Sequence, residues 1–202
     1  MTQQPLLEVD PAVRRAFDYY PTPAWMTLAL LARVPVKGYI LEPCAGRLAI
    51  ADVLRAQTGV LHVETNDLAP STPVDTHLDA AQPEYWHALQ NRTHNRVNAA
   101  VTNAPYDLAD VIVPLAVRTL PIFATVLRLS WLEPTEKRGA FLAKYPPSNL
   151  IVMPRHDFKS RGQTDSVTSA WFVWQKGDRR QQIDIVTKAE RDELKAVTEA
   201  VS

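Results

Sequence analysis

A short stretch near the middle of the chain has the residue types of a site that could hold an amino group. An apolar run over 98–102, typical of a buried strand, ends in Asn103, Ala104, Pro105 and Tyr106. Because Pro105 restricts the residue before it, we expect the Asn103 side-chain oxygen and the Ala104 carbonyl to face one point beyond the strand. Two acceptors suit an exocyclic –NH2 group, whose nitrogen could attack a methyl group while Tyr106 stacks on its ring. An ordinary Asn-x-Pro turn is the alternative interpretation.

A second set of candidate residues follows two earlier apolar runs. The run over 37–41 leads into the small-residue turn 42–46, and a predicted helix comes next. This arrangement lets a ligand approach backbone N–H groups. The run over 60–64 is followed by Asp67, which lies 21 positions after Gly46. Nucleotide-binding sheets hold a ribose diol with an acid at this position, although such an acid is also a common turn residue.

Strands and helices are expected to alternate along the chain. The predicted strands are 37–41, 60–64, 74–79, 97–102, 122–129, 149–154 and 169–174, with 182–186 as a further strand. The predicted helices are 22–33, 48–56, 80–90, 108–119, 134–144 and a C-terminal helix from 187. This alternation favours an α/β fold with a mainly parallel sheet covered on both faces. Ligands of such sheets bind beyond the carboxyl ends of the strands, where we expect Gly46, Asp67, Asp79 and Asn103 to form one site.

Length and composition narrow the class of protein. The 202 residues, of which 46% are hydrophobic and 22% charged, predict one globular domain, with an N-terminal arm over 1–16 and a C-terminal helix over 187–202. We expect no membrane span and no secretory signal, since the sequence has no apolar run long enough for either. One cysteine and five scattered histidines predict a cytoplasmic protein without a metal site.

The charge distribution is uneven although the formal net charge is zero. Zero net charge argues against binding nucleic acid through bulk charge. However, residues 128–161 contain seven Lys or Arg and three Asp or Glu. This block includes the basic stretch 155–161, with Phe158 inside it. Such a stretch is typical of a loop that contacts phosphates, or else of a solvated face.

The tetrapeptide 103–106 resembles the Asn/Asp-Pro-Pro-Tyr/Phe motif of amino-directed methyltransferases. These enzymes use S-adenosylmethionine and act on adenine N6, cytosine N4 or glutamine side-chain amides. The order of segments over about 17–177 resembles the DNA adenine N6-methyltransferases, especially the compact kind of phages and prophages. The resemblance implies a three-layer sandwich around a seven-stranded, mostly parallel, Rossmann-like methyltransferase sheet. It also implies a bacterial or phage-infected cell as the setting.

The resemblance further implies a role for each matching residue. The implied cofactor-binding residues are Tyr20, Pro21, Thr22, Pro23, Glu42, Pro43, Cys44, Ala45, Gly46, Asp67, Leu68, Asp79 and Asn103. The implied catalytic residues are Asn103, Ala104, Pro105 and Tyr106. The implied DNA contacts are Arg128, Arg155, Lys159 and Arg161. In this family Asp67 would hold the ribose hydroxyls and Asp79 would lie near the adenine amino group. The expected substrate is double-stranded DNA with a flipped adenine, or single-stranded DNA.

Two positions depart from the family pattern. Ala104 stands where the family has its first proline, so the carbonyl acceptor remains but rigidity is lost. Arg47 and Leu48 stand where the family has a further residue and a second glycine, and a leucine there could crowd the cofactor. Two alternatives therefore stay open. One is an amino-methyltransferase acting on RNA or on protein glutamine, and the other is a catalytically impaired, methyltransferase-like nucleic-acid-binding protein.

Overall fold

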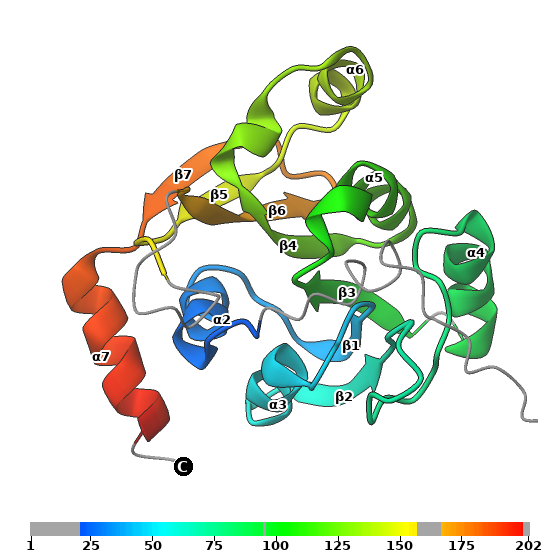
Figure 1. Ribbon diagram of the computed structural model, residues 1–202, viewed down its shortest axis with the longest axis horizontal. Helices are drawn as coiled ribbons and strands as arrows, with labels where there is room; N and C mark the ends of the chain where they lie inside the picture. The colour runs from blue at the N-terminus through cyan, green and yellow to red at the C-terminus, as the bar shows by residue number, and fades with distance from the viewer. Residues whose placement is uncertain (1–20, 95, 157–166, 200–202) are drawn as a thin grey trace, which may run out of the picture.

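A seven-stranded sheet forms the centre of the protein (Figure 1). The computed structural model describes residues 21–94, 96–156 and 167–199, so Tyr20, Lys159, Arg161 and the arm 1–16 lie outside the described residues. The strands are β1 (Gly38–Glu42), β2 (Val60–Thr65), β3 (Val97–Thr102), β4 (Ile122–Arg128), β5 (Asn149–Val152), β6 (Ser169–Gln175) and β7 (Gln182–Ile185). Their order in the sheet is β2-β1-β3-β4-β6-β5-β7, and β6 runs antiparallel to its neighbours β4 and β5. The predicted seven-stranded, mostly parallel sheet is confirmed.

Helices cover both faces of the sheet, as predicted for a three-layer sandwich (Figure 1). One face carries α2 (Ala24–Leu31), α3 (Ala49–Arg55) and α7 (Lys188–Glu199). The other carries α4 (Pro83–Arg92), α5 (Ala109–Thr119) and α6 (Glu136–Lys144), with short 3-10 turns η1 (Tyr106–Leu108) and η2 (Leu129–Leu132). No helix in the described ranges is long and apolar enough to cross a membrane.

Tryptophans of β6 attach helices from both faces to the sheet. The indole N–H of Trp171 donates to the Met26 carbonyl of α2 at 2.8 Å. The indole N–H of Trp174 donates to the Tyr145 carbonyl, just after α6, at 2.9 Å. A buried indole stabilises a fold only if its N–H finds an acceptor, and here both acceptors are backbone groups. Bulky side chains on both faces of β6 therefore fix the two helical layers.

The predicted third strand over 74–79 is wrong. In its place the structure has one isolated parallel bridge between Asn66 and Thr76. Side chains of β2 and the residue after it bind this segment: the Asp75 carboxylate accepts from the Thr65 backbone N–H and hydroxyl, both at 2.8 Å. Leu78, one of the two apolar residues in the segment, is 43% exposed, so little apolar surface holds it as a strand.

No single apolar stripe defines the buried side of α2. Trp25, Met26, Ala29 and Leu30 are buried together with Thr27, whereas Leu28 and Leu31 are half-buried and Ala32 is exposed. The helix packs against the sheet and also contacts α7, so its apolar residues are buried on more than one side.

Candidate functional site

The carboxyl ends of β1, β2 and β3 lie side by side. Glu42, the last residue of β1, pairs with Thr65, the last residue of β2, while Leu41 pairs with Ala100 of β3. The loops that follow these parallel strands therefore meet at one edge of the sheet. We call this the carboxyl edge, and define it by the loops 43–48, 66–82, 103–108, 129–135 and 153–156.

The glycine turn and the predicted acid are joined directly. The Gly46 backbone N–H donates to Asp67 Oδ2 at 2.7 Å, and Asp67 Oδ1 accepts from the Ala69 N–H at 2.9 Å. Gly46 has φ of +50°, a left-handed conformation that favours glycine. The spacing of 21 residues in the sequence thus corresponds to a contact between the tips of β1 and β2.

Asn66 is the residue that sequence reasoning missed. Its side chain is completely buried, and its amide donates to the carbonyls of Pro43 and Leu78, both at 2.9 Å. Its oxygen accepts from the Thr76 hydroxyl at 2.7 Å and the Leu78 N–H at 2.9 Å. All four hydrogen-bonding positions of the amide are therefore used. Asn66 therefore connects the glycine turn to the segment 76–78. In the sequence, only its position directly before Asp67 could have indicated a role at this edge.

Two further acids of this edge, Asp75 and Asp79, hold the loop after β2. Burial alone would raise the pKa of Asp75, but the hydrogen bonds from the Thr65 N–H and hydroxyl outweigh it and lower that pKa. Asp79 accepts from the Ala81 N–H at 2.9 Å and from the Gln82 side chain at 3.1 Å. The sequence predicted that Asp79 ends a strand. In the structure Asp79 instead comes directly after Leu78, whose backbone is bound by the Asn66 side chain. Leu68 is 47% exposed.

The tetrapeptide 103–106 begins where β3 ends. Asn103 and Tyr106 are half-buried, while Ala104 is 2% exposed and packs into the core under α4 and α5. The guanidinium carbon of Arg128, at the end of β4, lies 4.9 Å from the centre of the Tyr106 ring. Arg128, which was predicted to contact DNA, thus lies over the ring of Tyr106, which was predicted to stack on a base. Arg155, beyond β5, is exposed.

The glycine turn contains two ionisable groups, the buried Glu42 and the half-buried Cys44. Burial raises the pKa of Glu42 well above its ordinary value of 4.5, despite a hydrogen bond from the Ala51 backbone and the charge of Arg55. Burial likewise raises the pKa of the Cys44 thiol, and the carboxylate of Asp67 adds to the effect. The Cys44 thiol is therefore protonated at neutral pH and is not a nucleophile. In the described part of the chain, no group of three or more His, Cys, Asp or Glu is placed to hold a metal ion.

Leu48 adopts a left-handed backbone conformation, which favours glycine. Its φ is +69°, immediately before α3, which costs a non-glycine residue roughly 1–2 kcal/mol. Its half-buried side chain packs against the core cluster that contains Ile50 and Leu54. The departure from the family pattern thus strains the backbone, while the side chain contacts the protein core.

The residues of this edge fit S-adenosylmethionine. A carboxylate offers about four lone pairs, so Asp67 can accept hydroxyl groups in addition to its two N–H donors. The Thr22 hydroxyl and Glu42 Oε2 are buried and have no hydrogen-bond partner among residues 21–94, 96–156 and 167–199. A polar ligand would give these atoms the partners that buried polar groups require.

The fold is the Rossmann-like α/β fold of class I S-adenosylmethionine-dependent methyltransferases. No protein-family model matches the sequence, and no curated protein matches it significantly. Among solved structures, the methyltransferase subunit of a type I restriction-modification system from Streptococcus thermophilus is 14% identical, with a TM-score of 0.59 over 93% of this chain. The cryo-EM structure of a DrdV–DNA complex is 12% identical, with a TM-score of 0.60 over 92% of this chain.

A proposed RNA methyltransferase from Pyrococcus horikoshii is also similar in structure. It is 12% identical, with a TM-score of 0.55, and the match covers 79% of this chain and 88% of that protein. By contrast, this chain spans 55% of the Streptococcus subunit and 30% of the DrdV chain. At these identities the comparisons establish the fold alone.

Proposed function

We propose that this protein transfers a methyl group from S-adenosylmethionine to the exocyclic N6 amine of adenine in DNA. The observation that carries the proposal is the arrangement at the carboxyl edge. The tetrapeptide 103–106 follows β3 directly, and the neighbouring tips of β1 and β2 are joined by the bond between Gly46 and Asp67. Two of the structural neighbours, a restriction-modification methyltransferase subunit and a DNA complex, support DNA as the substrate.

Each residue of the proposed cofactor site has a definite task. Asp67 would accept the ribose hydroxyls, and Asp79 would lie near the adenine amino group of the cofactor. Thr22 and Glu42 would bind polar groups at the methionine end, where they have partners to gain. When bound, S-adenosylmethionine supplies an electrophilic methyl group on a sulfonium.

The tetrapeptide would position the target amine. The Asn103 oxygen and the Ala104 carbonyl would each accept one amine hydrogen, which favours a pyramidal nitrogen with its lone pair directed at the methyl group. Tyr106 would stack on the flipped adenine, an interaction worth about 1–3 kcal/mol. Much of the rate enhancement would come from holding nitrogen and methyl at near-attack distance.

Cations near the tetrapeptide would contact the DNA backbone. Arg128 lies over Tyr106, so an incoming base would share or displace this contact and free the guanidinium for a phosphate. Arg155 would bind phosphate from the loop after β5, together with Lys159 and Arg161 outside the described residues.

Substitution of Asn103 tests the proposal. We expect Asn103→Ala to lower methyl transfer to DNA by at least about 100-fold, because one of the two amine acceptors is lost. Binding of S-adenosylmethionine, measured by calorimetry, should stay within a few-fold of the parent. Unchanged transfer of labelled methyl to DNA by this variant would sink the assignment.

A second candidate is methyl transfer to an amine in a protein or in RNA. The described loops of the carboxyl edge contain five carboxylates and two cations, which favours a neutral or basic protein substrate over a polyanion, whether DNA or RNA. Measuring labelled methyl in DNA, RNA and protein separately discriminates between these substrates. No detectable binding of S-adenosylmethionine at millimolar concentration would instead favour a non-catalytic, nucleic-acid-binding relative of these enzymes.

A further inference from the structure

Cations gather on the edge of the sheet opposite the candidate site. We call this the amino edge, because its loops precede the parallel strands, and β6 ends there since it runs in the reverse direction. Three neighbouring segments contribute. They are the last turn of α5, the end of α6 and the turn between β6 and β7. Their cations, which we call the basic cluster, are Arg118, Lys144, Lys176, Arg179 and Arg180.

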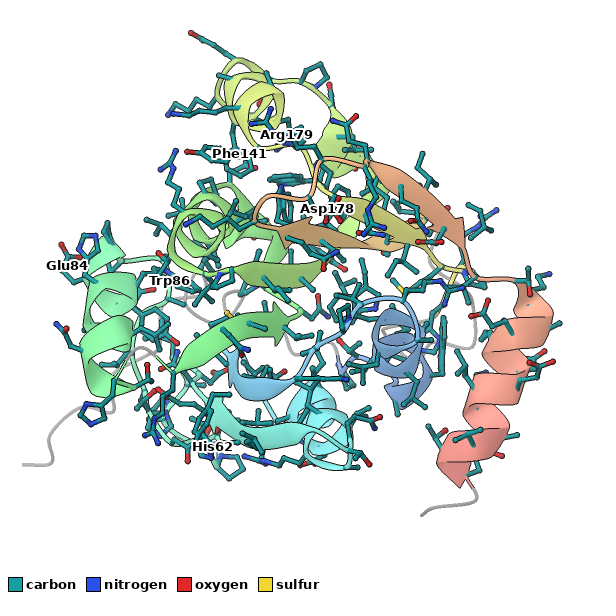
Figure 2. The ribbon with its side chains drawn as sticks, turned by 180° about the vertical axis from the view of Figure 1, so that it is seen from behind. His62, Glu84, Trp86, Phe141, Asp178 and Arg179 are labelled. Carbon is teal, nitrogen blue, oxygen red and sulfur yellow. The ribbon has the colours of Figure 1, made fainter. Side chains whose placement is uncertain are left out.

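A hydrogen bond and two cation–π contacts bring these three segments together. The Lys176 backbone N–H donates to the Pro121 carbonyl at 2.8 Å, so the turn starts beside the chain that leaves α5. Arg118 and Lys144 lie over the same aromatic ring, with Cζ and Nζ respectively 6.0 and 5.4 Å from the centre of Tyr145. Figure 2 shows Asp178 and Arg179 in the same part of the molecule as Phe141 of α6. The basic cluster is therefore one surface and not a set of scattered side chains.

Most of this positive charge has no carboxylate to balance it. Arg180 is paired with Asp178, with Nη2 and Oδ2 2.7 Å apart. The other four cations are exposed and make no ion pair within the described ranges. Asp178 is the one acid in the segments 115–121, 142–148 and 175–181, which hold five cations. An excess of four charges in three short segments contrasts with a net charge of zero for the chain.

Stability of the fold does not account for all of these cations. Arg118 and Lys144 lie in the last turns of helices, where a cation interacts favourably with the helix dipole. Lys176 and Arg179 lie in a turn between two strands, where no such dipole acts. Their mutual repulsion is a cost that an anionic ligand would remove.

The shape of the surface indicates an extended ligand. The hollow of about 490 Å³ between α5 and α6, which Arg118 also lines, is nearly balanced in charge, because its lining contains two carboxylates and three cations. Its Asp110 receives two hydrogen bonds from Arg138 at 2.9 Å. The excess charge instead spans the ends of the neighbouring strands β4, β6, β5 and β7, a width of roughly 14 Å at about 4.8 Å per strand. This width suits several phosphates of a polymer better than one small anion.

We propose that the basic cluster binds the phosphate backbone of a nucleic acid without reading its sequence. The surface lies on the opposite edge of the sheet from Gly46, Asp67 and Asn103. It would hold a nucleic acid apart from the candidate active site, and the proposal holds whether or not that site transfers methyl groups. An acidic protein is the competing kind of partner.

Fluorescence anisotropy of the full chain with a labelled duplex and a labelled single strand, each of about 30 nucleotides per strand, tests this proposal. The variant Lys176→Glu/Arg179→Glu is compared with Lys188→Glu/Lys195→Glu on α7, which changes the charge equally. We expect the first variant to lose at least about tenfold in affinity near 50 mM salt, and its salt slope to fall by about two. The control should change affinity less than about threefold.

Equal losses in the two variants, or no nucleic-acid binding by the parent, would overturn the proposal. Binding of poly-glutamate in place of nucleic acid would overturn it in favour of an acidic partner. Calorimetry with S-adenosylmethionine on both variants distinguishes a failure of nucleic-acid binding by the basic cluster from a failure of the proposed methyl transfer. Lys176 and Arg179 lie on the amino edge, so cofactor binding of the first variant should be unchanged, and a failure of methyl transfer would leave the anisotropy result intact.

Discussion

The two edges of the sheet differ in charge and in how that charge is held. The described loops of the carboxyl edge contain five carboxylates and two cations. The described loops of the amino edge, 32–37, 56–59, 93–96, 120–121, 145–148 and 176–181, contain six cations and one carboxylate. The described loops of the two edges therefore carry opposite excess charge, although the net charge of the chain is zero.

Burial separates the two edges as well. On the carboxyl edge, polar groups are buried and bound to backbone, as Asn66 is, or buried without a hydrogen-bond partner among the described residues, as Glu42 Oε2 is. On the amino edge most cations extend into solvent and Arg96 lies over the Tyr39 ring at 4.7 Å, whereas Arg33 is half-buried and paired with Glu190. Substitutions should therefore change stability strongly at the first edge and weakly at the second. The following predictions test that contrast.

Asn66→Ala should have the largest effect on stability. It leaves the Pro43 and Leu78 carbonyls, the Leu78 N–H and the Thr76 hydroxyl without their partner. With about 1–3 kcal/mol for each buried group that stays unpaired, we expect a loss of roughly 3 kcal/mol in urea unfolding. Affinity for S-adenosylmethionine should fall too, because the glycine turn loses its tether.

Asn66→Asp is the matched control. A carboxylate keeps the two acceptor contacts but not the two donor contacts, so it should be destabilising as well. Equal stability of Asn66→Ala and the parent would show that the carboxyl edge is not held by this amide.

The sequence predicted the parts of this edge that depend on chain order. Alternating strands and helices, the glycine turn and Asp67 follow from patterns within short windows, and the bond between Gly46 and Asp67 agrees with them. Asn66 could not be found in this way, because its four partners come from segments that the sequence does not place beside it. The same reason explains the third strand, which polar side-chain contacts replace.

The difference in charge between the two edges could not be predicted from the sequence either. The turn 176–181 lies on the amino edge only because β6 runs antiparallel. If all strands ran in one direction, the three cations of this turn would follow a strand at the carboxyl edge. Charge counts along the chain indicated a basic block at 128–161. They could not indicate which edge each cation faces, because this depends on the direction of β6.

Glu42→Gln should make stability less dependent on pH. Burial raises the pKa of Glu42 in the folded state above its ordinary value of 4.5. Between these two pKa values the unfolded chain ionises while the folded chain stays protonated, so the parent loses about 1.4 kcal/mol of stability per pH unit as pH rises. The variant lacks this loss, and its stability relative to the parent should rise with pH above about 4.5.

Urea unfolding of both proteins at several pH values measures this difference. Above the folded pKa both states of the parent are ionised, so the difference should become constant. A constant difference across the whole range would mean that Glu42 is ionised in the folded protein and that burial does not dominate its pKa.

Leu48→Gly should be more stable than Leu48→Ala, by about 1 kcal/mol. Both variants lose the packing of the leucine side chain, but alanine retains the cost of a left-handed φ near +69°, which glycine does not have. Urea unfolding of the two variants measures the strain directly. In Ala49→Gly, at the first position of α3, where the backbone is helical, glycine should give no such gain. The opposite order at Leu48 would place the strain elsewhere.

Removing charge from the amino edge should have the smallest effect on stability. Lys176→Ala/Arg179→Ala deletes two exposed cations that have no ion pair among the described residues, so we expect a change within about 0.5 kcal/mol. Because repulsion among the remaining cations is relieved, we expect any gain in stability at low salt, and this gain should vanish as salt screens it. A loss above about 1 kcal/mol would show that these cations stabilise the fold, and the two edges would then differ in charge alone.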